Sequence, residues 1–373
     1  MMKNKKHAKV LVHLMAIGVG ALLGVVIAIF DFGFLEFFLS AFLGYNIAVI
    51  IHEGGHLVFG LLSGYGFSSF RIWSFMILKG ERGVEFKRYK LAGTGGQCLM
   101  IPPNGRNEDA PVLLYNLGGV IFNLILSLVC LYFYFTHPDV IILSCTMLLT
   151  AVLSAFTLFT NGIPMYIGGI ANDGMNALSL RKDKTAKTAF LNQLRMNRGQ
   201  ICGQKLSDMP DEWFAIPDGA DRQNTAYSSI AVFRVNRNFE SLDTLKSEKE
   251  IEELLNSDWN IIGLHRNLLN CDLAYCRLVN YGSSADVGLV NTPEMMTFRK
   301  AMKNFMSVIR TEYALSLIHD GNTAEAEKKL ALFEKAAKTS PYIADIKVER
   351  ELVALAKDSE GKRKTENKTE QNI

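Results

Sequence analysis

Four long apolar runs occupy most of the first half of the chain, whereas charged residues are spread through the second half. Each run holds roughly 20 residues with almost no charge, the length that an α-helix needs to cross a bilayer. The pattern therefore predicts an all-α membrane domain of four transmembrane helices followed by a soluble domain. The predicted spans are about residues 10–30, 37–62, 112–135 and 140–160.

The first run follows a basic stretch between Lys3 and Lys9. A signal peptide begins in a similar way, but its apolar core is shorter and a cleavage site of small residues follows it. Here the run continues into Phe30, Asp31 and Phe32. The sequence therefore predicts an uncleaved membrane anchor.

Two segments of the membrane domain differ from simple spans. Residues 67–87 alternate between apolar and polar positions on both sides of a turn at 79–83, which predicts a β-hairpin-like loop. The fourth span leads into Asn161, Gly162, Ile163 and Pro164, followed by a Gly-rich apolar segment. Because Gly and Pro interrupt helices, we expect a broken re-entrant segment at membrane depth over residues 161–180.

The soluble half is expected to be mostly α-helical. Residues 1–181 form the predicted membrane domain, 182–357 a cytoplasmic helical domain, and 358–373 a polar tail expected to be disordered. Within 305–356 the pattern predicts helix, turn, helix and turn, which resembles one tetratricopeptide-type hairpin. Only one copy is recognisable, so a plain helical bundle stays open as the alternative.

Charge indicates topology more than partners. Lys and Arg total 40 against 37 Asp and Glu, and no nucleic-acid partner is expected. The loops near Asp31 and Asp139 lack basic residues, whereas the N-terminus, the 71–90 loop and the segment after residue 180 contain several. The positive-inside rule then places both termini in the cytoplasm of an integral membrane protein, for which we expect a bacterial cell membrane. The six cysteines form no CxxC pair and are interpreted as small buried or free thiols.

The second run contains His52, Glu53 and His56 in the order His-Glu-Gly-Gly-His. Two histidines four residues apart lie on one face of a helix, where both imidazoles can bind one metal ion. Ionisable groups inside a spanning helix cost about 2.5–3.5 kcal/mol each for the strongly charged types, so three of them in five positions require compensation. A bound zinc ion provides it, with Glu53 placed to accept a proton from water.

Two histidines leave zinc one ligand short, because hydrolytic zinc sites usually have three protein ligands and an open position. Asp173 follows the helix-breaking residues 161–164 on the same side of the membrane as the histidines. It is the candidate third ligand, with a helix cap as the competing interpretation. Asn123 lies in the third span after Gly118 and Gly119. It is predicted either to hydrogen bond between helices or to donate to an oxyanion.

These motifs resemble the site-2 protease family of intramembrane zinc metalloproteases. That family carries HExxH, then a Gly-x-x-x-Asn-like motif, then Asn-x-x-Pro followed by Asp-Gly, and this order is met over roughly residues 38–180. The resemblance implies that Zn²⁺ is bound by His52, His56 and Asp173, with Glu53 as catalytic base and Asn123 as a catalytic contact to substrate or oxyanion. It implies substrate-binding roles for Gly119, Asn161 and Pro164.

The chain departs from the family pattern in the spacing of its third ligand. Asp173 follows Pro164 by nine residues, where the family has about five, and Asn172 stands in place of the usual Leu. The function expected from the sequence is zinc-dependent endopeptidase cleavage of a membrane-embedded substrate: a single-span regulator, a leader-peptide remnant or a peptide precursor. The alternative is a non-catalytic membrane scaffold or peptide-export accessory with a structural metal site. In both, the lipid bilayer surrounds the first domain. The helical domain is expected to select substrate or regulate cleavage in the protease, and to bind a protein partner in the scaffold.

Overall fold

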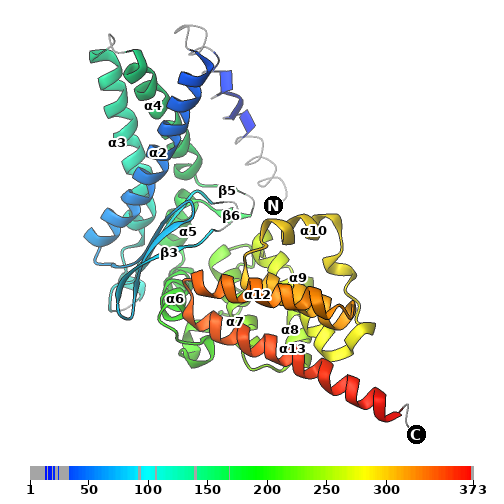
Figure 1. Cartoon of the computed structure of the whole chain (residues 1–373). Coiled ribbons are helices and arrows are strands. Elements are labelled where there is room, and N and C mark those ends of the chain that lie inside the picture. The colour runs from blue at the N-terminus through cyan, green and yellow to red at the C-terminus, as the bar shows by residue number, and fades with distance from the viewer. Residues whose placement is uncertain are drawn as a thin grey trace. The chain divides into compact units, whose positions relative to one another are not determined.

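The computed structural model describes residues 33–90, 94–105, 107–137, 141–167 and 169–370, together with positions 13, 14, 16–18, 20, 21 and 24. The chain divides into two compact units, one of residues 1–79 with 93–191 and one of residues 80–92 with 192–373. Figure 1 shows their helices and strands. The sequence places the domain boundary at residue 181, whereas the units divide at Leu191.

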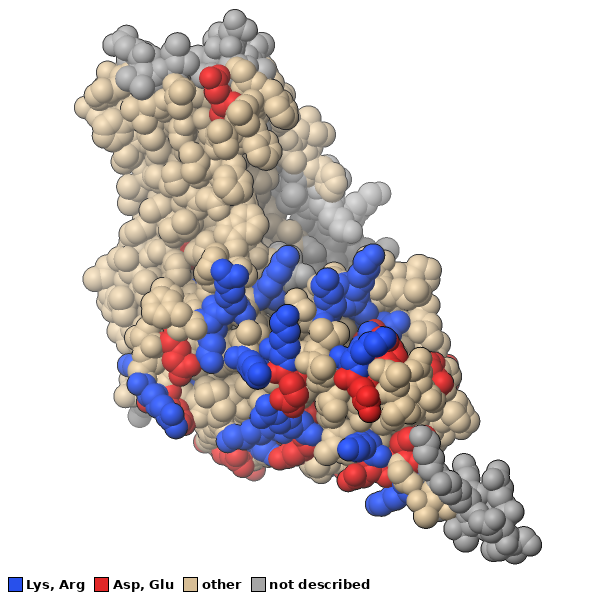
Figure 2. Space-filling model, viewed as in Figure 1, with Lys and Arg blue, Asp and Glu red and all other residues tan. Residues whose placement is uncertain are grey.

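Three long helices form the centre of the first unit, and they pack on one another: α2 (Phe34–Leu62), α3 (Val112–Thr136) and α4 (Ile141–Gly162). Among the described residues, these three are the helices long and apolar enough to cross a membrane. Between 17% and 39% of their most apolar windows is buried, so most of these side chains point outward. The corresponding surface in Figure 2 is nearly free of charge.

The helices agree with three of the four predicted spans to within a few residues, because uninterrupted apolar runs leave little freedom in where a helix ends. The predicted span at 10–30 lies outside the described residues apart from the few positions given above. Three candidate spans, rather than the predicted four, are therefore described.

The predicted hairpin at 67–87 is part of a four-stranded sheet with the order β3-β2-β1-β4. Its strands are β1 (Gly66–Ile72), β2 (Phe75–Gly80), β3 (Gly83–Arg88) and β4 (Gly96–Ile101). An unpredicted turn at Trp73, whose φ is +54°, separates β1 from β2. This turn contains no Gly or Pro, so the alternating pattern gave no sign of it. Both β2 and β4 pair antiparallel with β1, which places β4 at an edge of the sheet.

The predicted break after the fourth span is present, since α4 ends at Gly162. A short antiparallel pair follows, formed by β5 (Tyr166–Ile167) and β6 (Ile170–Ala171). The chain then enters α5 (Asp173–Lys182). The segment after α4 is thus a small hairpin and a helix.

The second unit is helical around one continuous apolar core. Its longer elements are α7 (Thr225–Phe239), α8 (Thr244–Asn256), α9 (Gly263–Tyr281), α10 (Pro293–Ala301), α11 (Met306–Ala314), α12 (Thr323–Thr339) and α13 (Ile343–Glu370), and α6 (Lys184–Ile201) leads into them. Its core includes a fully buried Arg310, which pairs with Asp272 and with Glu349 at 3.1 Å. The expected helix–turn–helix is present as α11, α12 and α13, while a tetratricopeptide-type repeat stays a prediction.

The tail is helical where the sequence predicts disorder, since α13 continues to Glu370. Arg363 accounts for part of this difference. Its guanidinium donates to the carbonyl oxygen of Val279 on α9, and its side chain lies against Gly282. The polar sequence after Asp358 therefore extends a helix that is held by contacts on one side.

Candidate functional site

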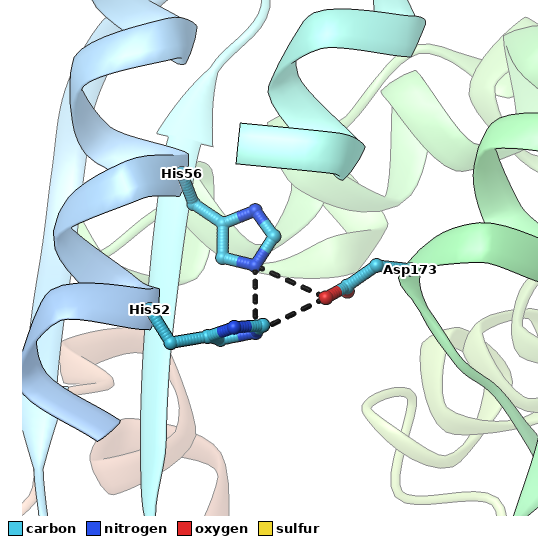
Figure 3. Close-up of side chains that lie close together, drawn as sticks. All are labelled: His52, His56 and Asp173. Carbon is cyan, nitrogen blue, oxygen red and sulfur yellow. Dashed lines mark hydrogen bonds and ion pairs between the residues drawn. The ribbon is translucent and has the colours of Figure 1, made fainter. Parts of the chain in front are cut away.

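Three side chains converge in the first unit, two from α2 and one from the start of α5 (Figure 3). The Nε2 atoms of His52 and His56 lie 3.3 Å apart. One carboxylate oxygen of Asp173, Oδ2, lies 3.1 Å from Nε2 of His52 and 3.4 Å from Nε2 of His56. The structure thus brings together the three residues that the sequence singled out as metal ligands.

The spacing of these donor atoms fits a small tetrahedral ion. Zinc bonds of about 2.0–2.2 Å place neighbouring ligand atoms about 3.3–3.6 Å apart in a tetrahedron. The measured separations of 3.1, 3.3 and 3.4 Å are close to that range. In addition, Oδ2 of Asp173 is buried and finds no partner with hydrogen-bond geometry among the described residues. A cation among the three atoms would satisfy this oxygen.

His56 is oriented by the backbone of α3. Its Nδ1 lies 2.8 Å from the carbonyl oxygen of Tyr115. Because a carbonyl oxygen only accepts, Nδ1 must carry the hydrogen, and neutral His56 then has its lone pair on Nε2, toward the other two donors. Sequence reasoning missed Tyr115, since a backbone carbonyl can belong to any residue type.

His52 is placed by two residues of α3. A Cβ on Gly119 would lie 2.6–2.7 Å from atoms of the His52 ring, so only glycine leaves room for the imidazole. The amide nitrogen of Asn123 lies 3.3 Å from Nδ1 of His52, the ring nitrogen opposite the one that faces Asp173. Both predicted residues therefore contact a candidate ligand, and neither lines the cavity beside Glu53.

Asp173 is positioned by its neighbour, Asn172. The Asn172 side chain donates to the carbonyl oxygens of Thr160 and Ile163 and accepts from the amides of Met165 and Met175. These four bonds tie the end of α4 to the first turn of α5. Most of the nine-residue gap between Pro164 and Asp173 is taken up by the β5–β6 hairpin. Because the two ends of this hairpin are held together, Asp173 still starts close to the end of α4.

Glu53 lies in a cavity of about 560 Å³ that His52 also lines. The cavity runs between α2 and α4, with the start of β4 on a third side, and its lining includes Tyr45, Val49, Gly96, Phe156 and Asn161. No hydrogen bond to the Glu53 carboxylate is found among the described residues. A partly buried carboxylate beside a metal-type site, open to a cavity of this size, is free to act on a bound molecule.

The start of β4 is close against Glu53. A Cβ on Gly96 would lie 2.5–2.8 Å from the side chain of Glu53, so a larger residue here would displace that side chain. Arg71, buried in β1, donates to the carbonyl oxygens of Trp73 and Gly96 and thereby holds the β1–β2 turn and the start of β4. Sequence reasoning counted Arg71 among the loop charges that set topology, and its burial gives it a structural role as well.

The last two predicted site residues lie in the last turn of α4 and just after its end. Asn161 lines the cavity and donates to the carbonyl oxygen of Thr157 one turn earlier. Pro164 is exposed and is not part of the cavity lining. A substrate role for Asn161 is thus compatible with its position, and Pro164 contributes by ending the helix.

Comparisons with known proteins identify no relative of this chain. No protein-family model, curated protein or solved structure matches this chain. Any function must therefore be argued from the site itself.

Proposed function

We propose that this chain is a zinc-dependent intramembrane endopeptidase that resembles the site-2 protease family. The observation that carries the proposal is the triangle of donor atoms from His52, His56 and Asp173, with sides of 3.1–3.4 Å. Glu53, next to His52 in the chain and in the adjoining cavity, supplies the base that a purely structural metal site would not need.

The chemistry divides between the ion and the protein. A zinc ion held by the three residues would supply Lewis acidity, which acidifies water and polarises a peptide carbonyl. Glu53 would accept a proton from the attacking water and return it to the nitrogen of the leaving peptide. Tyr115 and Gly119 keep the two imidazoles in place, and Asn172 does the same for Asp173.

The cavity and the sheet support a peptide as the substrate. Because β4 is an edge strand that begins beside Glu53, an extended peptide could add to this edge with its scissile bond near the carboxylate. A membrane-spanning helix must unwind before its bonds are accessible, and strand pairing would satisfy the exposed backbone groups. We therefore propose a membrane-embedded segment as substrate and the helical unit as its selector or regulator, with both termini in the cytoplasm.

The proposal is tested with the purified full-length protein, reconstituted into vesicles with a library of single-span peptides. Mass spectrometry of the peptides and metal analysis of the protein are compared for the wild type, Glu53→Gln and Asp173→Ala. We expect zinc-dependent cleavage by the wild type, zinc without cleavage for Glu53→Gln, and loss of zinc for Asp173→Ala. Cleavage that persists in Glu53→Gln would refute the catalytic role. A wild type that holds zinc and cleaves nothing would favour the scaffold alternative.

A further inference from the structure

The side chain of Asn123 is placed to do more than hold helices together. Asn123 is fully buried on α3, and its Nδ2 lies 3.3 Å from Nδ1 of His52. Its Oδ1 is also buried and has no hydrogen-bond partner among the described residues. The Asn123 backbone is held as well, because Ser154 of α4 donates to its carbonyl oxygen at 3.0 Å. The backbone of Asn123 is thus held in place, and its side-chain amide faces one imidazole.

The tautomer of His52 depends on which amide atom faces it. To bind a metal ion, Nε2 must offer a lone pair, so neutral His52 must carry its hydrogen on Nδ1. That N–H needs an acceptor, and the Asn123 amide oxygen can provide one. With the amide nitrogen facing Nδ1, the imidazole hydrogen lies on Nε2, the atom that is 3.1 Å from Oδ2 of Asp173.

We propose that Asn123 is a positioning residue that holds the metal-binding tautomer of His52 by turning its amide oxygen to Nδ1. Without metal, the same side chain turned by half a rotation donates to Nδ1 instead, and the hydrogen of His52 lies on Nε2, which faces Asp173. Both orientations occupy the same space, because the oxygen and nitrogen of an amide are almost equal in size. This inference rests on the proposed metal site. It assigns Asn123 to the support of the candidate ligand His52 and not to the stabilisation of an oxyanion.

Two competing roles account less well for the same contacts. As an oxyanion donor, Asn123 would have to reach the cavity beside Glu53, and it is not part of that lining. As a general link between helices, its amide would bond to backbone or to other polar side chains. Among the residues that the structure describes, its side chain makes one such contact, with His52, and the bond from Ser154 uses the Asn123 backbone.

The test compares zinc affinities of the full-length protein, measured in detergent by competition with a chromophoric chelator. Asn123→Leu removes the acceptor, whereas Asn123→Asp keeps one because a carboxylate only accepts. Asn116→Leu is the matched control: Asn116 is a buried asparagine two turns earlier on α3, and its amide donates to Val112 of its own helix at 2.7 Å. Removing the partner of a metal-bound histidine typically weakens binding by about 10- to 100-fold.

We expect Asn123→Leu to bind zinc about 10- to 100-fold more weakly, with Asn123→Asp and Asn116→Leu close to the wild type. Wild-type affinity in Asn123→Leu would overturn the inference, and so would an equal loss in Asn123→Asp. Thermal unfolding of the metal-free variants shows whether Asn123→Leu is folded, and the Asp variant carries the comparison if it is not. A wild type without zinc affinity would remove the proposed function itself, which is a different outcome.

Discussion

The amide nitrogen of Asn172 lies 2.6 Å from the carbonyl oxygen of Ile163, and this contact fixes where α5 begins relative to the end of α4. The same nitrogen donates to Thr160 at 2.7 Å, and the amide oxygen accepts from Met165 and Met175. An asparagine side chain has two donor hydrogens and one acceptor oxygen, so Asn172 uses all of them. These hydrogen bonds therefore also fix the position of the next residue, Asp173, and of its carboxylate.

Asn172→Ala should therefore impair the site without touching a ligand. Loss of the network leaves buried carbonyl and amide groups unpaired, at about 1–3 kcal/mol for each group. We expect destabilisation of at least about 2 kcal/mol and a zinc affinity reduced by about tenfold or more. Thermal unfolding and chelator competition measure both. Asn176→Ala, one turn later in α5 with a single long bond to Ala171, is the control and should stay near the wild type.

The sequence identifies the three candidate ligands of this site more readily than the residues that hold them in place. The spacing of His52 and His56 predicts a shared face on any helix, and the apolar runs locate the helices themselves. Tyr115 acts through its backbone carbonyl, and Asn172 acts through contacts that exist only once the hairpin after α4 has formed. Neither role has a residue pattern that a sequence could display. The same holds for Trp73, whose turn depends on a hydrogen bond from the buried Arg71.

The two adjacent glycines of the His-Glu-Gly-Gly-His motif should respond to alanine in opposite ways. A Cβ on Gly55 would lie 2.2 Å from the carbonyl oxygen of Gly118, whereas a Cβ on Gly54 would meet nothing within 4 Å. Gly55→Ala must push α2 and α3 apart, so we expect a loss of about 1–3 kcal/mol or more together with weakened zinc binding. Gly54→Ala should be neutral or slightly stabilising, because alanine favours helix. Equal unfolding temperatures for the two variants would contradict this packing.

Gly96→Ala should separate catalysis from metal binding. The added Cβ would lie 2.5 Å from the side chain of Glu53, so Glu53 must move while the three ligands stay in place. A displacement of about 1 Å can reduce a rate by about a hundredfold, so cleavage should fall steeply with zinc content unchanged. Gly66→Ala on β1 is the control, because its Cβ would meet Ile101 at ordinary contact distances of 3.4–3.9 Å. Loss of zinc from Gly96→Ala would show that β4 also supports the ligands.

The helical unit offers a prediction that does not depend on the metal. Asp345 on α13 accepts a hydrogen bond from Gln200 at 2.8 Å, and Glu349 one turn later pairs with the buried Arg310. Burial raises the pKa of Asp345 from 3.8 to about 7, and the nearby carboxylates of Glu349 and Glu240 add to the shift. Asp345 thus keeps a proton in the folded state at pH values where the unfolded chain has released it.

The sign of the pH dependence follows from this difference in bound protons. Between about pH 4 and pH 7 the folded state holds more protons, so the free energy of unfolding falls as pH rises and levels off above about pH 7. One full proton would correspond to about 1.4 kcal/mol per pH unit, and the partial exposure of Asp345 reduces this.

Asp345→Asn removes the ionisation and keeps an acceptor for Gln200. We therefore expect a flatter pH profile and stability at pH 7.5 equal to or above the wild type. Hydrogen exchange of α13 in the full-length protein, compared at matched pH, measures the difference. Glu327→Gln on the exposed side of α12 serves as the control, and a wild-type slope retained in Asp345→Asn would assign the titration to another group, with Glu349 the next to test.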